Sequence, residues 1–135
     1  MLKRPLNARF GPRVLAGIKR TTIRDTAWPL NKPIMLYHWS GKPYASPQQD
    51  VAAIQVRFTC PIIITRIHNE AGWPSVHFGM DPADFQKLPC GSTDLWQLEG
   101  FDSHQEMITW FLSTLKPGQT IHKHLMLFDL LPPET

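Results

Sequence analysis

The segment Gly17-Ile18-Lys19-Arg20-Thr21-Thr22-Ile23-Arg24 carries an amine, hydroxyls and guanidinium groups within eight residues. Gly17 follows a short apolar stretch that a proline opens, and a glycine at such a position typically ends a helix in the left-handed conformation. The residues after it favour an extended strand, in which Thr22 and Arg24 would share one face. Lys19 precedes that strand, within reach of the Thr22 hydroxyl. A neutral lysine beside a threonine can activate an oxygen nucleophile when burial or nearby cations lower the lysine pKa.

A second short motif, Glu99-Gly100-Phe101, lies near the other end of the chain. Taken alone, the first cluster also fits an exposed basic turn. Taken together, the spacing Gly-x-Lys-x-x-Thr-x-Arg and the Glu-Gly-Phe motif resemble the two signatures of ASCH domains, which are small relatives of the PUA fold. The resemblance covers both ends of the chain, and the middle of the chain is poorly covered.

Within that family, the pattern is most similar to the compact bacterial amidohydrolases that remove the acyl group from N4-acetylcytidine. Their lysine, threonine and glutamate correspond by position to Lys19, Thr22 and Glu99, which the resemblance therefore implies to be the catalytic residues. It implies hydrolysis of an N4-acylated cytosine nucleoside without a cofactor, and it places Glu99 just before a helix. Two routes stay open: attack by Thr22 with Lys19 as base, or attack by water activated through Glu99.

The chain departs from the compact enzymes in its length. Roughly 30 residues, from about His68 to Leu98, are rich in Trp, Pro and Gly. We interpret residues 68–98 as an insertion that could cap or reshape the cleft. With 135 residues, of which 42% are hydrophobic, the chain is expected to form a single ASCH domain, residues 1–135, around one core.

Apolar runs separated by prolines favour short strands joined by irregular turns. Strands are expected at residues 22–24, 33–39 and 120–131, and helices at residues 12–17, 81–88 and 103–117. Residues 51–67 are expected to form two short strands or one bent strand, because Pro61 cannot donate to a ladder. The fold class is therefore α+β, and the resemblance implies a small PUA-like β-barrel with flanking helices.

Basic residues are concentrated at the start of the chain. Seven of the fourteen Lys and Arg residues lie in the first 24 positions, with no acidic residue among them. They fit a solubilising surface, or a face that attracts a phosphate-bearing ligand such as a nucleotide or RNA. An RNA-binding module, or an RNA-cleaving one, is therefore the alternative function, since PUA-like folds commonly hold RNA and tryptophans can stack on bases.

Three further residues are candidates for substrate binding. Tyr37 and Trp39 would project from one side of the expected strand at residues 33–39, where either ring could stack on a pyrimidine or pack into the protein. Arg24 could bind the substrate or order Glu99 through a charge-assisted pair. The modified cytidine nucleoside is the expected small-molecule partner, with RNA as a second candidate.

Metal and thiol chemistry have little support in the sequence. His122 and His124 alternate on the expected last strand, but no third ligand has recognisable spacing and the zinc deaminase signature is absent. We therefore expect a metal-independent enzyme. Cys60 and Cys90 are expected to be reduced, with Cys60 buried.

The N-terminal sequence Met1-Leu2-Lys3-Arg4-Pro5 is followed by no apolar run of the kind found in signal peptides. No segment approaches the roughly 20 apolar residues that a membrane-spanning helix needs. We expect a cytoplasmic protein without a membrane partner.

Overall fold

The structure, a computed structural model, describes residues 1–89 and 94–132. Its strands are β1 (Leu2–Pro5), β2 (Thr21–Arg24), β3 (Pro33–Trp39), β4 (Gln48–His68), β5 (Pro74–Gly79) and β6 (Thr120–Leu130). Its helices are η1 (Ala8–Phe10), α1 (Gly11–Leu15), α2 (Pro82–Phe85), α3 (Leu95–Glu99) and α4 (His104–Leu112).

The strands form one mixed sheet. Its order is β1-β3-β4-β6-β2, and β5 pairs with β4 off this path. Strand β1 runs parallel to β3, and the other pairs are antiparallel. The α+β class is therefore confirmed. Within the described residues no ladder joins the edge strands β1 and β2, so the sheet is not closed, and the expected barrel stays a prediction.

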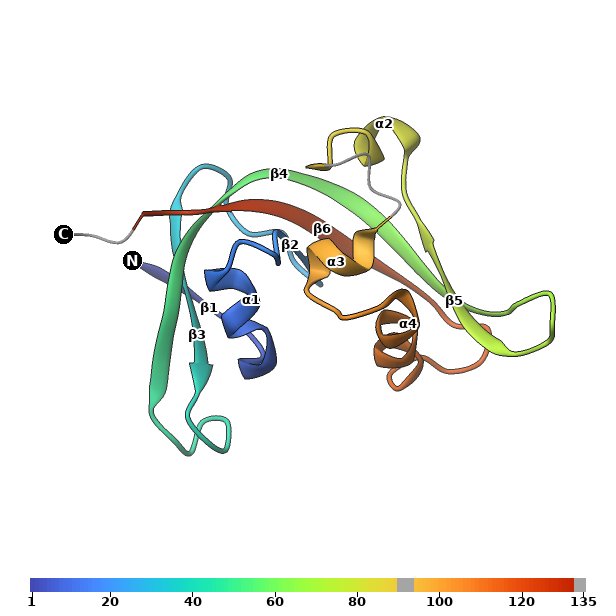
Figure 1. Cartoon of the computed structure of the whole chain (residues 1–135), viewed down its shortest axis with the longest axis horizontal. Helices are drawn as coiled ribbons and strands as arrows, with labels where there is room; N and C mark the ends of the chain where they lie inside the picture. Colours follow the sequence, from blue (N-terminus) through green and yellow to red (C-terminus); the bar gives the residue numbers. More distant parts are fainter. Residues whose placement is uncertain (90–93, 133–135) are drawn as a thin grey trace.

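Strands β4 and β6 are the two longest strands of the sheet, and they pair with each other. Residues 51–67 belong to the single strand β4, which takes up a register shift between Val56 and Phe58 opposite β6. An irregularity of this kind bends a strand and increases its twist, so one bent strand replaces the two short strands considered above. In Figure 1 both long strands arch over α1, α3 and α4, while α2 lies on the outer side of the arch.

The segment from residue 68 to residue 98 adds regular structure to the same sheet. Strand β5, which the sequence did not predict, pairs with the end of β4 from Ile63–Gly79 to His68–Pro74. Asp81 caps α2, because its side chain accepts a hydrogen bond from the backbone N–H of Ala83 at 2.8 Å. Cys90 lies outside the described residues.

The helix ends expected from the sequence are present at two places. Gly17 has a φ of 74°, and this left-handed residue turns the chain from α1 toward β2. Ser103 caps α4 by accepting a hydrogen bond from the N–H of Glu106 at 3.1 Å. Helix α4 ends at Leu112, five residues before the proline at which it was expected to stop. No helix in the described parts of the chain is long and apolar enough to cross a membrane.

Candidate active site

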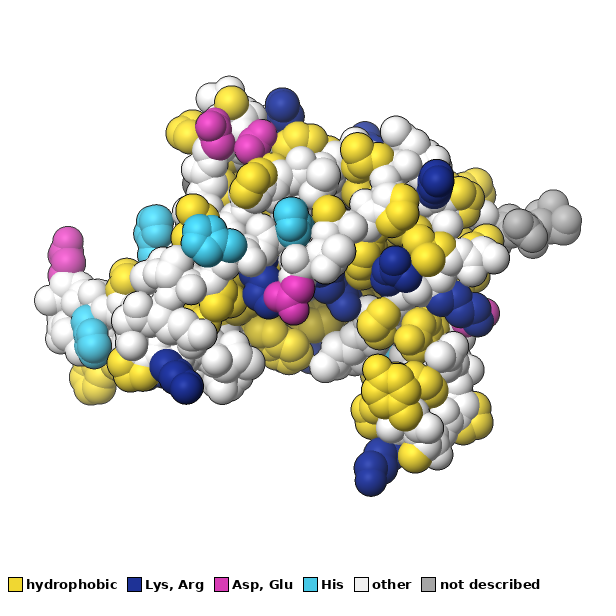
Figure 2. Space-filling model, turned by 180° about the vertical axis from the view of Figure 1, so that it is seen from behind, with side chains coloured by type: hydrophobic (Ala, Val, Ile, Leu, Met, Phe, Trp, Pro, Cys, Tyr) yellow, Lys and Arg dark blue, Asp and Glu magenta, His cyan; other side chains and the backbone are white. Residues whose placement is uncertain are grey.

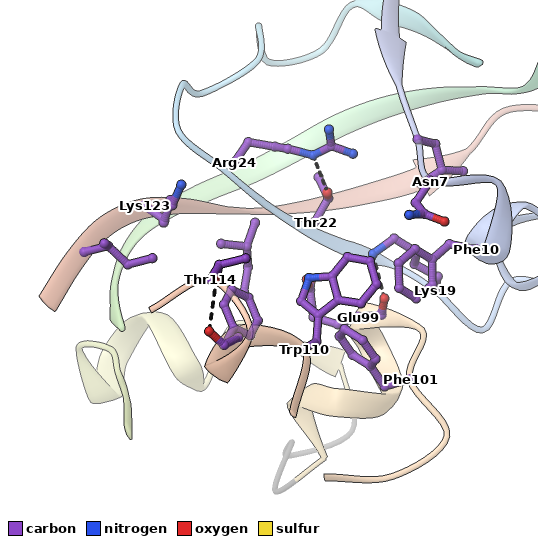
Figure 3. A pocket seen from close by; sticks show the side chains of 14 residues that line it. Asn7, Phe10, Lys19, Thr22, Arg24, Glu99, Phe101, Trp110, Thr114 and Lys123 are labelled. Atoms are coloured by element: carbon purple, nitrogen blue, oxygen red, sulfur yellow. Dashed lines mark hydrogen bonds between the residues drawn. The ribbon is translucent and has the colours of Figure 1, made fainter. Parts of the chain in front are cut away.

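A cavity of about 350 Å³ opens where the edge strand β2 faces the N-terminal turn and α4. Its walls include Lys19, Thr22 and Arg24 from the β2 segment, Glu99 from α3 and Trp110 from α4. Figure 3 shows these side chains around the cavity. Its volume lies within the roughly 300–1,000 Å³ typical of small-molecule sites. The three residues expected to be catalytic therefore line one cavity.

Lys19 is only 4% exposed, and its amine is held by backbone carbonyl groups. The Nζ atom donates to the carbonyl oxygens of Thr21 at 2.7 Å and Glu99 at 2.6 Å. Burial lowers the pKa of Lys19 from its usual 10.5; Glu99 raises it in part and Arg24 lowers it further. A neutral amine has two N–H groups and one lone pair, so these two hydrogen bonds leave the lone pair available to accept a proton.

Glu99 is the last residue of α3, and only 5% of it is exposed. The expectation that it stands just before a helix is wrong in detail, because α4 begins only at His104. Gly100 ends α3 with a φ of 95°, a conformation that glycine adopts readily. The Glu99 carboxylate accepts a hydrogen bond of 2.5 Å from the hydroxyl of Thr21. Glu99 is thus fixed by a residue that the sequence analysis did not assign to the site.

Thr21 and Thr22 point to different partners, as alternating residues of a strand do. Thr21 is completely buried and bonds to Glu99, whereas the hydroxyl of Thr22 accepts a hydrogen bond from Nε of Arg24 at 2.9 Å. The expected shared face of Thr22 and Arg24 is therefore confirmed. Among the described hydrogen bonds, none joins the Thr22 hydroxyl to Lys19. The strand alternation itself was the signal that could have assigned Thr21 to Glu99.

Arg24 lies between the hydroxyl of Thr22 and an aromatic ring. Its guanidinium carbon is 4.9 Å from the ring centre of Trp28, a cation–π distance. Burial lowers the pKa of Arg24, and the charge of Glu99 opposes this effect. No carboxylate of the described residues lies within ion-pair distance of Arg24. The pair with Glu99 considered above is thus a longer-range attraction, and the direct contact is with Thr22.

An aromatic cluster forms another wall of the cavity. The rings of Phe10, Phe101 and Trp110 meet edge to face, with centroid distances of 5.3 to 5.6 Å. The helical spacing of α4 predicted Trp110 to be a core residue, but it is 37% exposed and lines the cavity. Met107 and Leu115 of the same predicted stripe are buried, as expected.

Tyr37 and Trp39 are placed elsewhere. Their rings contact each other at a centroid distance of 5.7 Å, and Trp39 also contacts Tyr44, in the hairpin between β3 and β4. Neither ring belongs to the described lining of the cavity. The hairpin projects from the body of the protein in Figure 1. The structure therefore brings Arg24 to the expected catalytic residues and separates Tyr37 and Trp39 from them.

Ion pairs neutralise much of the basic N-terminal segment. Four of its cations bind carboxylates far along the chain: Lys3 with Asp50, Arg9 with Glu106, Arg13 with Asp102 and Arg20 with Asp129. Lys19 is buried. Clustering in the sequence therefore overstates the positive field that this segment presents to a ligand.

Two other residue types bear on the chemistry. In the described parts of the chain, no group of three or more His, Cys, Asp or Glu side chains is arranged to hold a metal ion, and this holds for His122 and His124. Cys60 is buried, and desolvation is the main cause that raises its pKa to about 11. Its thiol is therefore protonated at neutral pH, which does not suit a nucleophile.

Comparisons of the chain with protein-family models, with curated proteins and with solved structures find no match. The geometry of the cavity and the two sequence motifs therefore carry the argument about function.

Proposed function

We propose that the protein is an amidohydrolase that removes the acyl group from N4-acetylcytidine or a related N4-acylated cytosine nucleoside. The observation that supports this most is the meeting of Lys19, Thr22 and Glu99 in one cavity, although 80 residues separate Lys19 from Glu99. All three are at most 5% exposed. Polar side chains so deeply buried around an open cavity are more typical of a reactive site than of a solvated turn.

In the first proposed route, neutral Lys19 takes the proton of the Thr22 hydroxyl, whose oxygen attacks the acyl carbon. The bond from that carbon to N4 breaks, and the proton passes to the departing exocyclic amine. Water then cleaves the ester on Thr22 and releases the carboxylic acid. The hydrogen bond from Arg24 supports this role, because a guanidinium N–H stabilises negative charge on the threonine oxygen.

In the second proposed route, water activated through Glu99 attacks the acyl carbon directly, and Lys19 and Thr22 polarise the carbonyl group. The buried carboxylate of Glu99, which Thr21 fixes, supports this role. Intact-mass analysis of protein quenched during turnover separates the routes, since only the first gives an acylated protein whose label maps to Thr22.

The proposal includes the fold and the domain organisation. The bent strands β4 and β6, with helices on their concave side, support an open form of a PUA-like barrel. We propose that the chain is one such domain in which residues 68–98 are an insertion relative to the compact enzymes. The addition of β5 to the edge of the ladder supports this description.

The alternative function, an RNA-binding or RNA-cleaving module, depends on the basic N-terminal segment. Exposed ion pairs contribute only about 0–1 kcal/mol each, so RNA could displace these carboxylates, but their presence lowers the attraction for phosphate. The pairing of Lys3, Arg9, Arg13 and Arg20 therefore favours the enzyme over the RNA-binding module.

Incubation of the purified protein with N4-acetylcytidine, with chromatographic detection of cytidine, tests the proposal. We expect release of cytidine and acetate that survives a strong chelator, because the proposed groups need no metal. A protein that releases no cytidine from any N4-acylcytidine, but binds RNA with a salt-sensitive affinity, contradicts the enzyme and supports the alternative. Activity lost in chelator and restored by zinc contradicts the metal-independent chemistry.

A further inference from the structure

The cavity contains a cation, Lys123, that the proposed hydrolysis does not use. Its described lining includes the cations Arg24 and Lys123 but only one carboxylate, that of Glu99, while Lys19 acts in the proposed route as a neutral amine. Figure 2 shows basic side chains near the middle of one face, with an acidic side chain in front of them and hydrophobic side chains beside them. A neutral nucleoside gives no reason for this excess of cations, because an anionic ligand gains most from them.

Arg24 is a partly buried cation with unused donors. Its Nε–H binds Thr22 and its central carbon lies over the ring of Trp28, so the guanidinium is held in place before any ligand arrives. A guanidinium has four further N–H groups on its terminal nitrogens. In the described chain these donors reach no carboxylate within ion-pair distance. An oriented guanidinium of this kind matches the oxygens of a phosphate.

Lys123 comes from the neighbouring strand. Arg24 stands opposite His124 in the register of β2 and β6, Lys123 is the residue before His124, and Arg24 and Lys123 both belong to the described lining of the cavity. The side chain of Lys123 is 24% exposed and pairs with Asp25, whose own side chain is 82% exposed. An exposed carboxylate is a weak partner that a stronger anion can displace. The ion pair with Asp25 therefore leaves Lys123 available to a phosphate in the cavity.

We propose that Arg24 and Lys123 bind the phosphate of the substrate, so that the protein prefers an N4-acylated cytidine mononucleotide to the corresponding nucleoside. This inference rests on the proposed function, because the cytosine base comes from it. In Figure 3 Lys123 lies on the opposite side of the cavity from Lys19 and Glu99, with Arg24, Thr22 and Trp110 between. A nucleotide would thus place its acyl group at Lys19 and Glu99, its base against Trp110 and its phosphate at Lys123.

Isothermal titration calorimetry with cytidine and cytidine monophosphate tests this without requiring turnover. We expect the monophosphate to bind at least about tenfold more tightly, because charge-assisted hydrogen bonds to phosphate are strong. The difference should shrink between about 50 mM and about 200 mM salt. Equal affinities overturn the inference, whether or not N4-acetylcytidine is hydrolysed. A clear preference for the monophosphate supports the phosphate site even if no hydrolysis is found.

Two variants, each with a matched control, test whether Lys123 belongs to the phosphate site. Lys123→Met should lower the affinity ratio of monophosphate to cytidine about tenfold, and Lys116→Met, an equal loss of charge on an exposed residue outside the cavity, should leave the ratio unchanged. Asp25→Asn should raise the ratio, because it frees Lys123, whereas Asp50→Asn should not. If both lysine variants, or both aspartate variants, act alike, the effect is general charge and the assignment fails.

Binding of a short RNA shows whether the site prefers a mononucleotide or an RNA strand. A short single-stranded RNA with one internal cytidine carries the same phosphate chemistry. We expect it to bind less tightly than the monophosphate, because a cavity of this volume accommodates a single nucleotide. Tighter binding of the RNA, lost in Lys123→Met, would overturn the mononucleotide and identify the phosphates of an RNA strand as the ligand.

Discussion

The Nζ atom of Lys19 is 2.6 Å from the carbonyl oxygen of Glu99 and not in a hydrogen bond with its carboxylate. The amine is therefore held by backbone, while the carboxylate is held separately by the Thr21 hydroxyl. Changes to the Glu99 side chain should leave the hydrogen bonds of Lys19 in place. A substitution of the Glu99 side chain thus acts on Lys19 through charge, because Glu99 raises the pKa of Lys19, and not through the hydrogen bonds of the amine.

Loss of any of the three proposed catalytic groups should abolish most turnover. We expect Lys19→Ala, Thr22→Ala and Glu99→Gln each to lower kcat for N4-acetylcytidine by about 100-fold or more, the effect of removing a general base or nucleophile. Circular dichroism should show folded protein in each case. Arg4→Ala, at a cation outside the cavity lining, is the control and should retain activity. An unchanged kcat in Thr22→Ala would exclude the acyl-enzyme route.

Thr21 should act as a positioning residue. Thr21→Val keeps the shape of the side chain but removes the donor to Glu99, and hydrogen bonds to charged groups contribute about 1.5–3 kcal/mol. We expect kcat to fall roughly tenfold or more with little change in KM, and Thr21→Ser to restore it. A fall in stability with unchanged kcat would mean that Thr21 is only structural.

The rate should depend on pH through Lys19. Because burial lowers its pKa below 10.5, kcat/KM should rise with pH along a limb whose midpoint lies below 10.5. Arg24 contributes to this lowering, so Arg24→Gln should move the midpoint to higher pH. Between the folded and unfolded pKa values of Lys19, unfolding takes up a proton. Stability relative to Lys19→Met should therefore increase as pH rises through that interval.

We expect the cytosine base to stack on Trp110 and not on Tyr37 or Trp39. Stacking of a base on an aromatic side chain is worth about 1–3 kcal/mol, so Trp110→Ala should raise KM by about tenfold. Tyr37→Ala and Trp39→Ala should leave KM unchanged, because their rings lie outside the cavity lining. The opposite ranking in steady-state kinetics would show that the substrate reaches the β3–β4 hairpin.

Gly100 should tolerate no side chain. It has a φ of 95°, and an added Cβ would lie 3.0 Å from Cδ1 of Phe10 and 3.2 Å from Cδ of Lys19. Gly118 has a φ of 73° with nothing within 4 Å of such an atom, and it provides the matched control. Gly118→Ala should cost only the left-handed strain, about 1–2 kcal/mol. Chemical denaturation should show a larger loss for Gly100→Ala, with reduced turnover because Lys19 shifts.

The sequence predicted the helices and strands well where the types of neighbouring residues determine the local structure. Strand β3 has the expected bounds, and Gly17 and Ser103 end or begin their helices as their residue types predict. Strand β5 and helix α3 were missed, since pairing with β4 and packing beside α4, not local sequence preference, stabilise them.

The resemblance to ASCH domains also predicted that Lys19, Thr22 and Glu99 lie together, but it did not predict that Thr21 binds Glu99. The apolar part was not predictable in this way. The stripe of α4 predicts burial for Trp110, but only the placement of β2 and η1 determines that this ring borders an open cavity. The position of Tyr37 and Trp39 outside the described cavity lining was unpredictable for the same reason, since alternation along a strand does not show which part of the protein each face contacts.

Strand β2 has one described partner, β6, and β6 follows every other strand in chain order. During synthesis, Thr22 and Arg24 therefore have no neighbouring strand until more than 90 further residues have been made. Contacts of such long range form slowly. A ribosome-bound chain stalled before residue 120 can contain every proposed catalytic side chain and still lack the strand that pairs with Thr22. Activity would thus require synthesis through β6, a requirement that many sites built from adjacent residues do not have.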